Sequence, residues 1–232
     1  MATIIQKFGG SSVATIEHIR SAAEVVAARR RGGDDVAVVL SAMGDATDDL
    51  MALAAQVTER PAVRELDMLL SSGEQVSVAL MAMALKQLGV PARSYLGSQV
   101  CIRSDAVHGK ASIRSVDTHR LEGDLAAGVI PVVAGFQGVD DNGEITTFGR
   151  GGSDTTAVAL AAALGAAECQ ILTDVEGVYT TDPRMDPKAR LLSRITFEEM
   201  LEMSSLGSKA VSYTQLRAHE TANTLAVGLM CR

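Results

Sequence analysis

Cysteine is scarce in this sequence, with three residues among 232. Cys101, Cys169 and Cys231 form no CxxC pair and are widely separated. They are therefore too few and too scattered for a disulfide framework or a zinc site. This cysteine usage fits a reducing compartment.

Long apolar runs and basic patches are also missing. No uncharged run approaches the roughly 18 apolar residues that a membrane span needs, and Met1 leads into a strand-like segment instead of a signal peptide. The formal charge of −7 repels a nucleic-acid backbone, and the 3% of aromatic residues do not interleave with a basic stripe. We expect a cytoplasmic protein that binds neither nucleic acid nor a membrane.

What the sequence does contain is the composition of a compact domain, with 47% hydrophobic and 21% charged residues. Strand-like runs alternate with helical periodicity. The pattern predicts strands at 2–8, 36–40, 129–136 and 169–173, paired strands within 92–103, a hairpin turn at 140–143, and helices from 16 and 46, over 66–88 with a break near Ser72, at 157–164 and at 197–203. Such alternation predicts one three-layer α/β/α domain with a mostly parallel central sheet.

The 21 glycines gather in short loops, and the first loop covers residues 7–12. It lies between a strand and a helix, where backbone N–H groups and the helix dipole favour an anion and Lys7 could reach phosphate oxygens. The loop matches neither the P-loop spacing nor the dinucleotide fingerprint. A plain turn with a surface lysine is therefore the alternative.

A second loop, residues 148–156, combines three glycines with an arginine, an acid and several hydroxyls. Arg150 is suited to grip a planar carboxylate through two parallel hydrogen bonds. The alternative is an ordinary helix cap made by Ser153 or Asp154.

The third loop, residues 173–184, follows a buried strand at the edge where open α/β sheets bind ligands. Tyr179 could stack on a base and Arg184 could meet a phosphate. A turn marked by Asp182 and the following proline is the alternative.

Together with VLSAMGDATDD at 39–49, DMLLSSGEQV at 67–76 and AGFQG at 134–138, these loops resemble the motif series of aspartate kinases, in the amino-acid-kinase superfamily. Order and spacing match across roughly residues 2–211. The resemblance implies the amino-acid-kinase fold and transfer of the γ-phosphoryl group of MgATP to the side-chain carboxylate of L-aspartate. The product would be 4-phospho-L-aspartate, on the route to lysine, methionine and threonine, and the enzyme could be a homodimer.

The resemblance also implies roles at the phosphates. Lys7 and Lys209 would hold the transferring phosphate from two sides, and Asp154 would orient them. The remaining nucleotide contacts would come from Gly9, Gly10, Ser11, Ser41, Thr173, Asp174, Tyr179, Asp182 and Arg184. Mg²⁺ would be held mainly by phosphate oxygens and water, as this ion prefers.

On the amino-acid side, the resemblance pairs Glu74 with the substrate ammonium and Arg150 with a carboxylate. The pocket would be lined by Thr47, Gly151, Gly152 and Ser153. Glu74 is otherwise a solvated first-turn helix residue. An aspartate side chain, with a pKa of about 3.9, is already ionised at neutral pH and needs no general base, so the histidines are expected to be bystanders.

Two departures from the family pattern stand out. Aspartate kinases usually continue into small regulatory domains, and these 232 residues leave no room for them, so feedback inhibition is not expected. From Ser212 the sequence resembles translated sequencing-adapter read-through. We expect a catalytic domain over 1–211 and an atypical tail over 212–232, with a native gene that continues differently after Val211.

Two other functions stay open at this point. One is a related kinase that acts on glutamate, acetylglutamate, carbamate or a nucleotide monophosphate. The other is a nucleotide-binding protein that has lost catalysis through truncation.

Overall fold

The computed structural model describes residues 2–173, 180, 186 and 188–190. The helix predicted at 197–203 and the proposed boundary at Val211 lie outside these residues, so both stay predictions.

Among the described residues, five parallel strands form the main sheet, in the order β3-β6-β2-β1-β9. Their bounds are β1 Thr3–Phe8, β2 Asp35–Leu40, β3 Ala92–Tyr95, β6 Ile130–Ala134 and β9 Glu168–Leu172. β2 lies in the middle and is buried over all but its first residue, because both faces of the sheet are covered. The parallel strands expected near 2–8, 36–40, 129–136 and 169–173 are confirmed.

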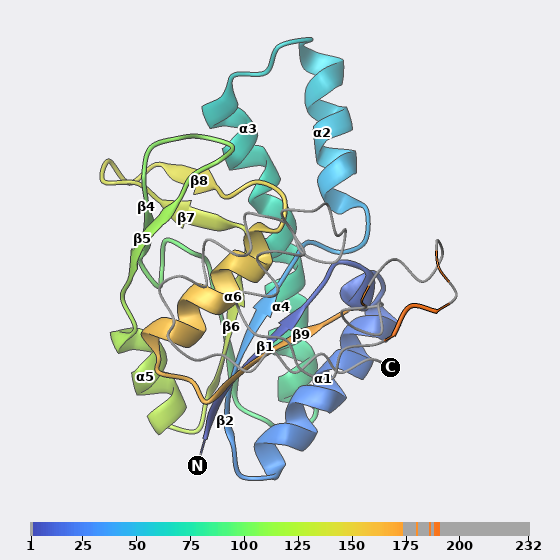
Figure 1. Cartoon of the computed structure of the whole chain (residues 1–232), viewed down its shortest axis with the longest axis vertical. Helices are drawn as coiled ribbons and strands as arrows, with labels where there is room; N and C mark the ends of the chain where they lie inside the picture. The colour runs from blue at the N-terminus through green and yellow to red at the C-terminus, as the bar shows by residue number, and fades with distance from the viewer. Residues whose placement is uncertain (1, 174–179, 181–185, 187, 191–232) are drawn as a thin grey trace.

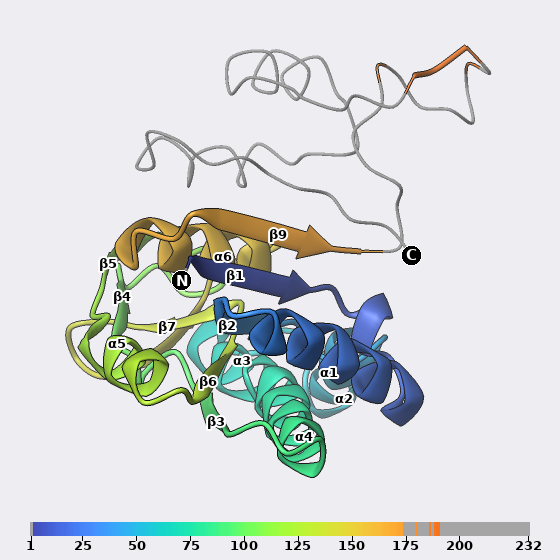
Figure 2. The same cartoon turned by 90° about the horizontal axis from the view of Figure 1, so that it is seen from below.

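Helices cover both faces of this sheet, as Figure 2 shows edge-on. Val36, Val38 and Leu40 face a core shared with α1 (Ile16–Arg31) and α4 (Ser72–Gln87). Ala37 and Val39 face the opposite core, shared with α5 (His119–Ala126) and α6 (Gly152–Ala163). This alternation along one strand builds the three layers, so the predicted α/β/α sandwich is confirmed.

A second, smaller sheet lies beside the first, and two further helices stand at the top of Figure 1, one of them next to this sheet. Its described strands run in the order β5-β4-β7-β8. Their bounds are β4 Ile102–Ser104, β5 Ile113–Val116, β7 Gln137–Val139 and β8 Ile145–Thr147; the helices are α2 Ala46–Val57 and α3 Val63–Leu70. α3 packs directly against β8, and a short 3₁₀ turn, Ser11–Val13, follows β1.

Some local predictions from the sequence are confirmed, and others are wrong. The hairpin turn at 140–143 joins β7 to β8, and the apolar stretch at 66–88 breaks at Ser71, so both are confirmed. The pairing expected within 92–103 is wrong, because β3 joins the main sheet while β4 joins the second. β5 and α5 were not anticipated, and α6 begins at Gly152 rather than at 157.

The turn between β3 and β4 carries the chain from one sheet to the other. Gly97 sits there against the backbone of β7, and a Cβ at this position would lie 2.4 Å from the Gln137 carbonyl oxygen. A side chain at position 97 would therefore push the two sheets apart.

The stretch Val63–Gln87 has the length and composition of a membrane-crossing helix, with a mean hydropathy of 1.4. In the structure it is divided between α3 and α4, and half of its most apolar window is buried inside the protein. Val78, Met81 and Leu85 belong to the core beneath the main sheet. We interpret α4 as the core helix of this domain.

The crossing at Gly97 gives a prediction about stability. Gly97→Ala should lower the free energy of unfolding by about 1–3 kcal/mol, the usual cost of overpacking. Gly123→Ala is the matched control, because a Cβ there meets no atom of the described structure within 4 Å and alanine favours a helix. Urea denaturation measures both variants, and equal stabilities would contradict the proposed crowding at Gly97.

Candidate functional site

A cavity of about 340 Å³ opens where β1, β2 and β6 of the main sheet end and the second sheet begins. Open parallel sheets bind their ligands at this carboxyl edge. The cavity is lined by Lys7, Gly10, Ser41, Ala42, Gly44, Thr47, Glu74, Phe136, Gly149, Arg150, Gly151, Gly152, Ser153 and Asp154. Segments more than 140 residues apart in the sequence therefore meet at one site.

Lys7 is buried in the floor of this cavity. Its side chain leaves β1 on the face that α6 covers, and Lys7 is only 7% exposed. Nζ lies 2.5 Å from Oδ1 of Asp154, in the first turn of α6. The carboxylate lies where the helix dipole stabilises negative charge, and it balances the buried ammonium. The alternative of a turn with a surface lysine is therefore wrong.

The loops that follow β1 and β2 are fastened to each other. The N–H of Gly44 donates to the carbonyl of Gly10 at 3.0 Å, and the N–H of Ser41 donates to the carbonyl of Phe8 at 3.2 Å. A Cβ on Gly10 would come within 3.0 Å of the Ala42 carbonyl oxygen, so the two loops approach as closely as glycine permits. These contacts hold the Gly10 and Ser41 backbones at the cavity wall.

Glu74 enters the cavity from the first turn of α4 and is 3% exposed. Its Oε1 accepts a hydrogen bond from the Ala42 N–H at 3.0 Å, whereas its Oε2 has no partner within the described part of the chain. Burial raises the pKa of the Glu74 carboxyl to about 7, against the opposing effect of the Ala42 N–H. The alternative of a solvated helix residue is wrong, and the bare oxygen suits a cationic ligand.

Arg150 stands exposed at the rim of the cavity, between two glycines in the left-handed region. Gly149 has φ +73° and Gly151 has φ +77°, so the chain reverses on both sides of the arginine. Gly151 is the N-cap of α6, and no described side chain caps the helix. Ser153 and Asp154 lie inside its first turn, so the interpretation of this loop as an ordinary side-chain cap is wrong.

The structure brings most of the predicted residues together. Ten of them line the cavity: Lys7, Gly10, Ser41, Thr47, Glu74, Arg150, Gly151, Gly152, Ser153 and Asp154. Gly9 stands beside it, with its Cβ position 3.8 Å from Lys7 Nζ. Ser11 and Thr173 are described but do not line it. Asp174, Tyr179, Asp182, Arg184 and Lys209 lie outside the described residues.

Sequence reasoning assigned no role to four lining residues, Ala42, Gly44, Phe136 and Gly149. Ala42 acts through its backbone N–H, which carries no residue signature. Phe136 adopts φ +68°, and its N–H donates to the hydroxyl of Thr156 at 3.2 Å. Gly44, with φ +48°, and Phe136 both lie in motifs noted from the sequence, but those motifs do not show which atoms face the cavity.

Comparison with known proteins supports the resemblance. The model of the amino acid kinase family matches residues 2–225. An aspartate kinase of Stutzerimonas stutzeri is 59% identical over 229 residues, and an aspartokinase of Pseudomonas aeruginosa is 60% identical over the same length. Each alignment covers 99% of this chain but 55% of the relative, so the chain spans about half the length of these proteins.

Solved structures of similar proteins agree with the sequence comparison. The aspartate kinase of Synechocystis superposes with a TM-score of 0.82 at 49% identity, covering 99% of this chain and 38% of that one. Escherichia coli aspartokinase III, in complex with aspartate and ADP, gives 0.85 at 28% identity, covering 98% and 62%. The family model, the relatives and the solved structures agree, and the chain belongs to the amino acid kinase family.

Proposed function

We propose that this chain is the catalytic part of an aspartate kinase, which transfers the γ-phosphoryl group of ATP to the side-chain carboxylate of L-aspartate to give 4-phospho-L-aspartate. The arrangement of charge in one cavity carries the proposal. A buried lysine suits the phosphate, and a buried carboxylate with a bare oxygen and an arginine suit an amino acid. The aspartokinase solved with aspartate and ADP supports the same pair of ligands.

At the phosphate end, the main problem is repulsion between two anions. The attacking carboxylate is already ionised, so cations and N–H donors supply the catalysis by stabilising charge on the transferring group. Lys7 would take this role, with Asp154 holding Nζ in place across 2.5 Å. Lys209 would act from the other side, and Gly9, Gly10, Ser11 and Ser41 would contact the phosphates.

At the amino-acid end, Glu74 would receive the ammonium on the bare Oε2, and Arg150 would bind the α-carboxylate. Glu74 and Arg150 would then bind the ammonium and the carboxylate on the α-carbon, and the side-chain carboxylate would be directed at the phosphate. Thr47, Gly151, Gly152 and Ser153 would line the space between them. A bound ammonium would stabilise the charged form of Glu74 and so lower its raised pKa.

The rest of the nucleotide would lie against Thr173, Asp174, Tyr179, Asp182 and Arg184. MgATP would enter as a complex in which phosphate oxygens and water hold most of the metal. Within the described residues no three His, Cys, Asp or Glu side chains gather into a metal-binding group.

We place the enzyme in the cytoplasm, in the biosynthesis of lysine, methionine and threonine, and expect a homodimer from the family resemblance. Neither nucleic acid nor a membrane has a part in the proposed reaction.

One test of the proposed function concerns catalysis. With MgATP and hydroxylamine, the purified chain should form aspartate-dependent hydroxamate, and Lys7→Met should lower kcat by about 10²–10³-fold, the usual loss for one charge-stabilising donor. Circular dichroism and ATP binding serve as controls for folding. Folded, ATP-binding protein that forms no hydroxamate with aspartate would contradict the proposal. Activity with glutamate or acetylglutamate instead would assign a different acceptor.

Another test of the proposed function concerns Glu74 and pH. Glu74→Gln keeps an acceptor for the Ala42 N–H but loses the charge, so the KM for aspartate should rise about 10–100-fold while the KM for ATP stays the same. In the wild type, the aspartate KM should also rise as the pH falls below about 7, because protonation removes the partner of the ammonium. Glu74→Gln should lack this dependence, and identical pH profiles would contradict the assignment.

A further inference from the structure

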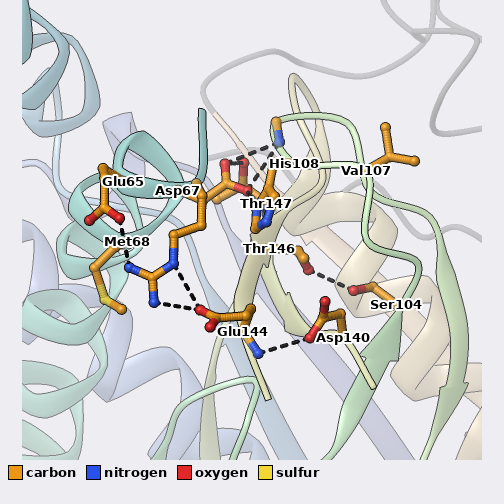
Figure 3. Close-up of polar contacts among 12 residues, drawn as sticks. Glu65, Asp67, Met68, Ser104, Val107, His108, Asp140, Glu144, Thr146 and Thr147 are labelled. Atoms are coloured by element: carbon orange, nitrogen blue, oxygen red, sulfur yellow. Dashed lines mark hydrogen bonds and ion pairs between the residues drawn. The ribbon is translucent and has the colours of Figure 1, made fainter. Parts of the chain in front are cut away.

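A buried carboxylate outside the cavity lies where three segments of the second sheet region meet. Asp67 belongs to α3 and is 1% exposed, although it does not line the cavity. Figure 3 shows it between the end of β8 and the loop at 105–112 that joins β4 to β5. A carboxyl group this deeply buried must be satisfied by several hydrogen-bond partners.

Those donors come from two segments far apart in the sequence. The Thr147 hydroxyl donates to Oδ1 of Asp67 at 2.6 Å, and the Thr147 N–H donates to Oδ2 at 3.2 Å. The Gly109 N–H lies 3.1 Å from both oxygens, and Nδ1 of His108 lies 2.8 Å from Oδ2. Charge-assisted bonds of this kind are among the stronger ones in proteins, so Asp67 ties α3, β8 and the 105–112 loop together.

The hydrogen bonds of Asp67 also hold the segment that carries Arg150, the arginine of the cavity. Arg150 comes three residues after Thr147, and Gly149 between them packs on the 105–112 loop. A Cβ at Gly149 would lie 3.2 Å from the Gly109 carbonyl oxygen, so the turn at Gly149 packs directly against the Gly109 backbone. The Arg150 side chain is exposed, and the backbone that carries it is held through the contacts of Thr147 and Gly149.

The same unit also reaches Glu74. Ser71 is the C-cap of α3, and its carbonyl accepts a buried hydrogen bond from Nε2 of Gln137 on β7 at 2.9 Å. Glu74 follows three residues later in the first turn of α4. Gln137 and Asp67 thus link the second sheet to the segment that carries Glu74. The same two residues link it to the segment that carries Arg150.

A second link between α3 and the β7–β8 hairpin is the ion pair of Arg64 with Glu144, also drawn in Figure 3. These side chains are 41% and 40% exposed. Exposed pairs contribute little because water and salt screen them. The buried Asp67 cluster is therefore the interaction that fixes this junction.

We infer that Asp67 is a positioning residue for the amino-acid substrate: through Thr147 and Gly109 it sets where Arg150 stands relative to Glu74 and Lys7. This inference rests on the proposed function. The position of the α-carbon decides whether a side chain of aspartate length reaches the phosphate held by Lys7. A loosened junction should therefore weaken aspartate binding and reduce the discrimination against glutamate, which is longer by one methylene.

The test compares two adjacent threonines of β8. Thr147→Val removes the hydroxyl that bonds Asp67, whereas Thr146→Val removes one that pairs with Ser104 at 2.6 Å. Both threonines are buried, at 1% and 0% exposure, so the structural cost is matched. Thr147→Val should raise the aspartate KM about tenfold, as expected for one hydrogen bond to a charged group, and leave the ATP KM unchanged.

The preference for aspartate over glutamate in kcat/KM should fall in the same variant. One methylene is usually discriminated by about 10–200-fold, which leaves a measurable range. Thr146→Val should keep the wild-type aspartate KM and preference, and Thr147→Ser should restore both. His108→Ala, a milder change at the same carboxylate, should move both values in the direction of Thr147→Val and provides the test if that variant fails to fold.

Equal shifts in Thr146→Val and Thr147→Val would overturn the inference, as would an unchanged KM and preference in Thr147→Val or, where that variant does not fold, in His108→Ala. Calorimetric titration with L-aspartate keeps this result separate from the proposed function. A wild type that binds aspartate without turnover contradicts the proposed catalysis, and the same variants then test the inference by Kd. A folded wild type that neither binds nor phosphorylates aspartate overturns both.

Discussion

The ion pair between Lys7 and Asp154 is the constraint on which the site depends. A lysine that is 7% exposed needs a carboxylate beside it, because an unpaired charge at this depth is costly. The pairing requires α6 to begin directly over the end of β1, since Asp154 lies in its first turn. The chain must therefore enter α6 through a compact, glycine-rich loop. A Cβ at Gly152 would lie 3.0 Å from atoms of Phe136 and Phe148, so a side chain there would crowd both phenylalanines. One charge pair thereby positions the sheet edge, the helix start and the rim of the cavity.

Glu74 shows that this site is arranged for a ligand rather than for stability. Its Oε2 is buried without a partner in the described structure, and its raised pKa of about 7 means that ionisation costs free energy in the folded protein. A group whose pKa is raised by folding stabilises the fold most at low pH and loses that contribution as the pH rises towards 7. At neutral pH the carboxylate is therefore strained by desolvation, and a substrate ammonium would relieve that strain. The same burial that weakens the fold would strengthen binding.

The sequence predicted the elements whose signal is local. Apolar runs such as 36–40 indicate strands buried on both faces, and the motifs pointed to Lys7, Glu74 and Arg150.

The sequence could not predict which sheet the strands within 92–103 would join, because an alternating pattern indicates a half-buried strand but not the strand it pairs with. The deciding contact, Gly97 on Gln137, joins positions 40 residues apart. Asp67 and Thr147 are 80 residues apart, and nothing in either residue indicates the other. The Ala42 N–H that supports Glu74 is a backbone group and leaves no trace in composition.

The two sheets divide the proposed chemistry between them. Lys7 stands on the main sheet, whereas Arg150 follows β8 of the second sheet and Glu74 follows a helix packed on β8. The phosphate end thus belongs to a frame with strands buried on both faces, which tolerates little displacement. At the amino-acid end, Arg150 follows a smaller unit held by a few buried polar contacts at Asp67 and Gln137. Glu74, by contrast, lies on α4, which packs against the main sheet. A small movement of the smaller unit would shift the acceptor relative to the phosphate and leave the main-sheet end of the site intact. If the proposed function holds, the choice of acceptor would therefore depend on how the second sheet is attached as well as on the side chains in the cavity.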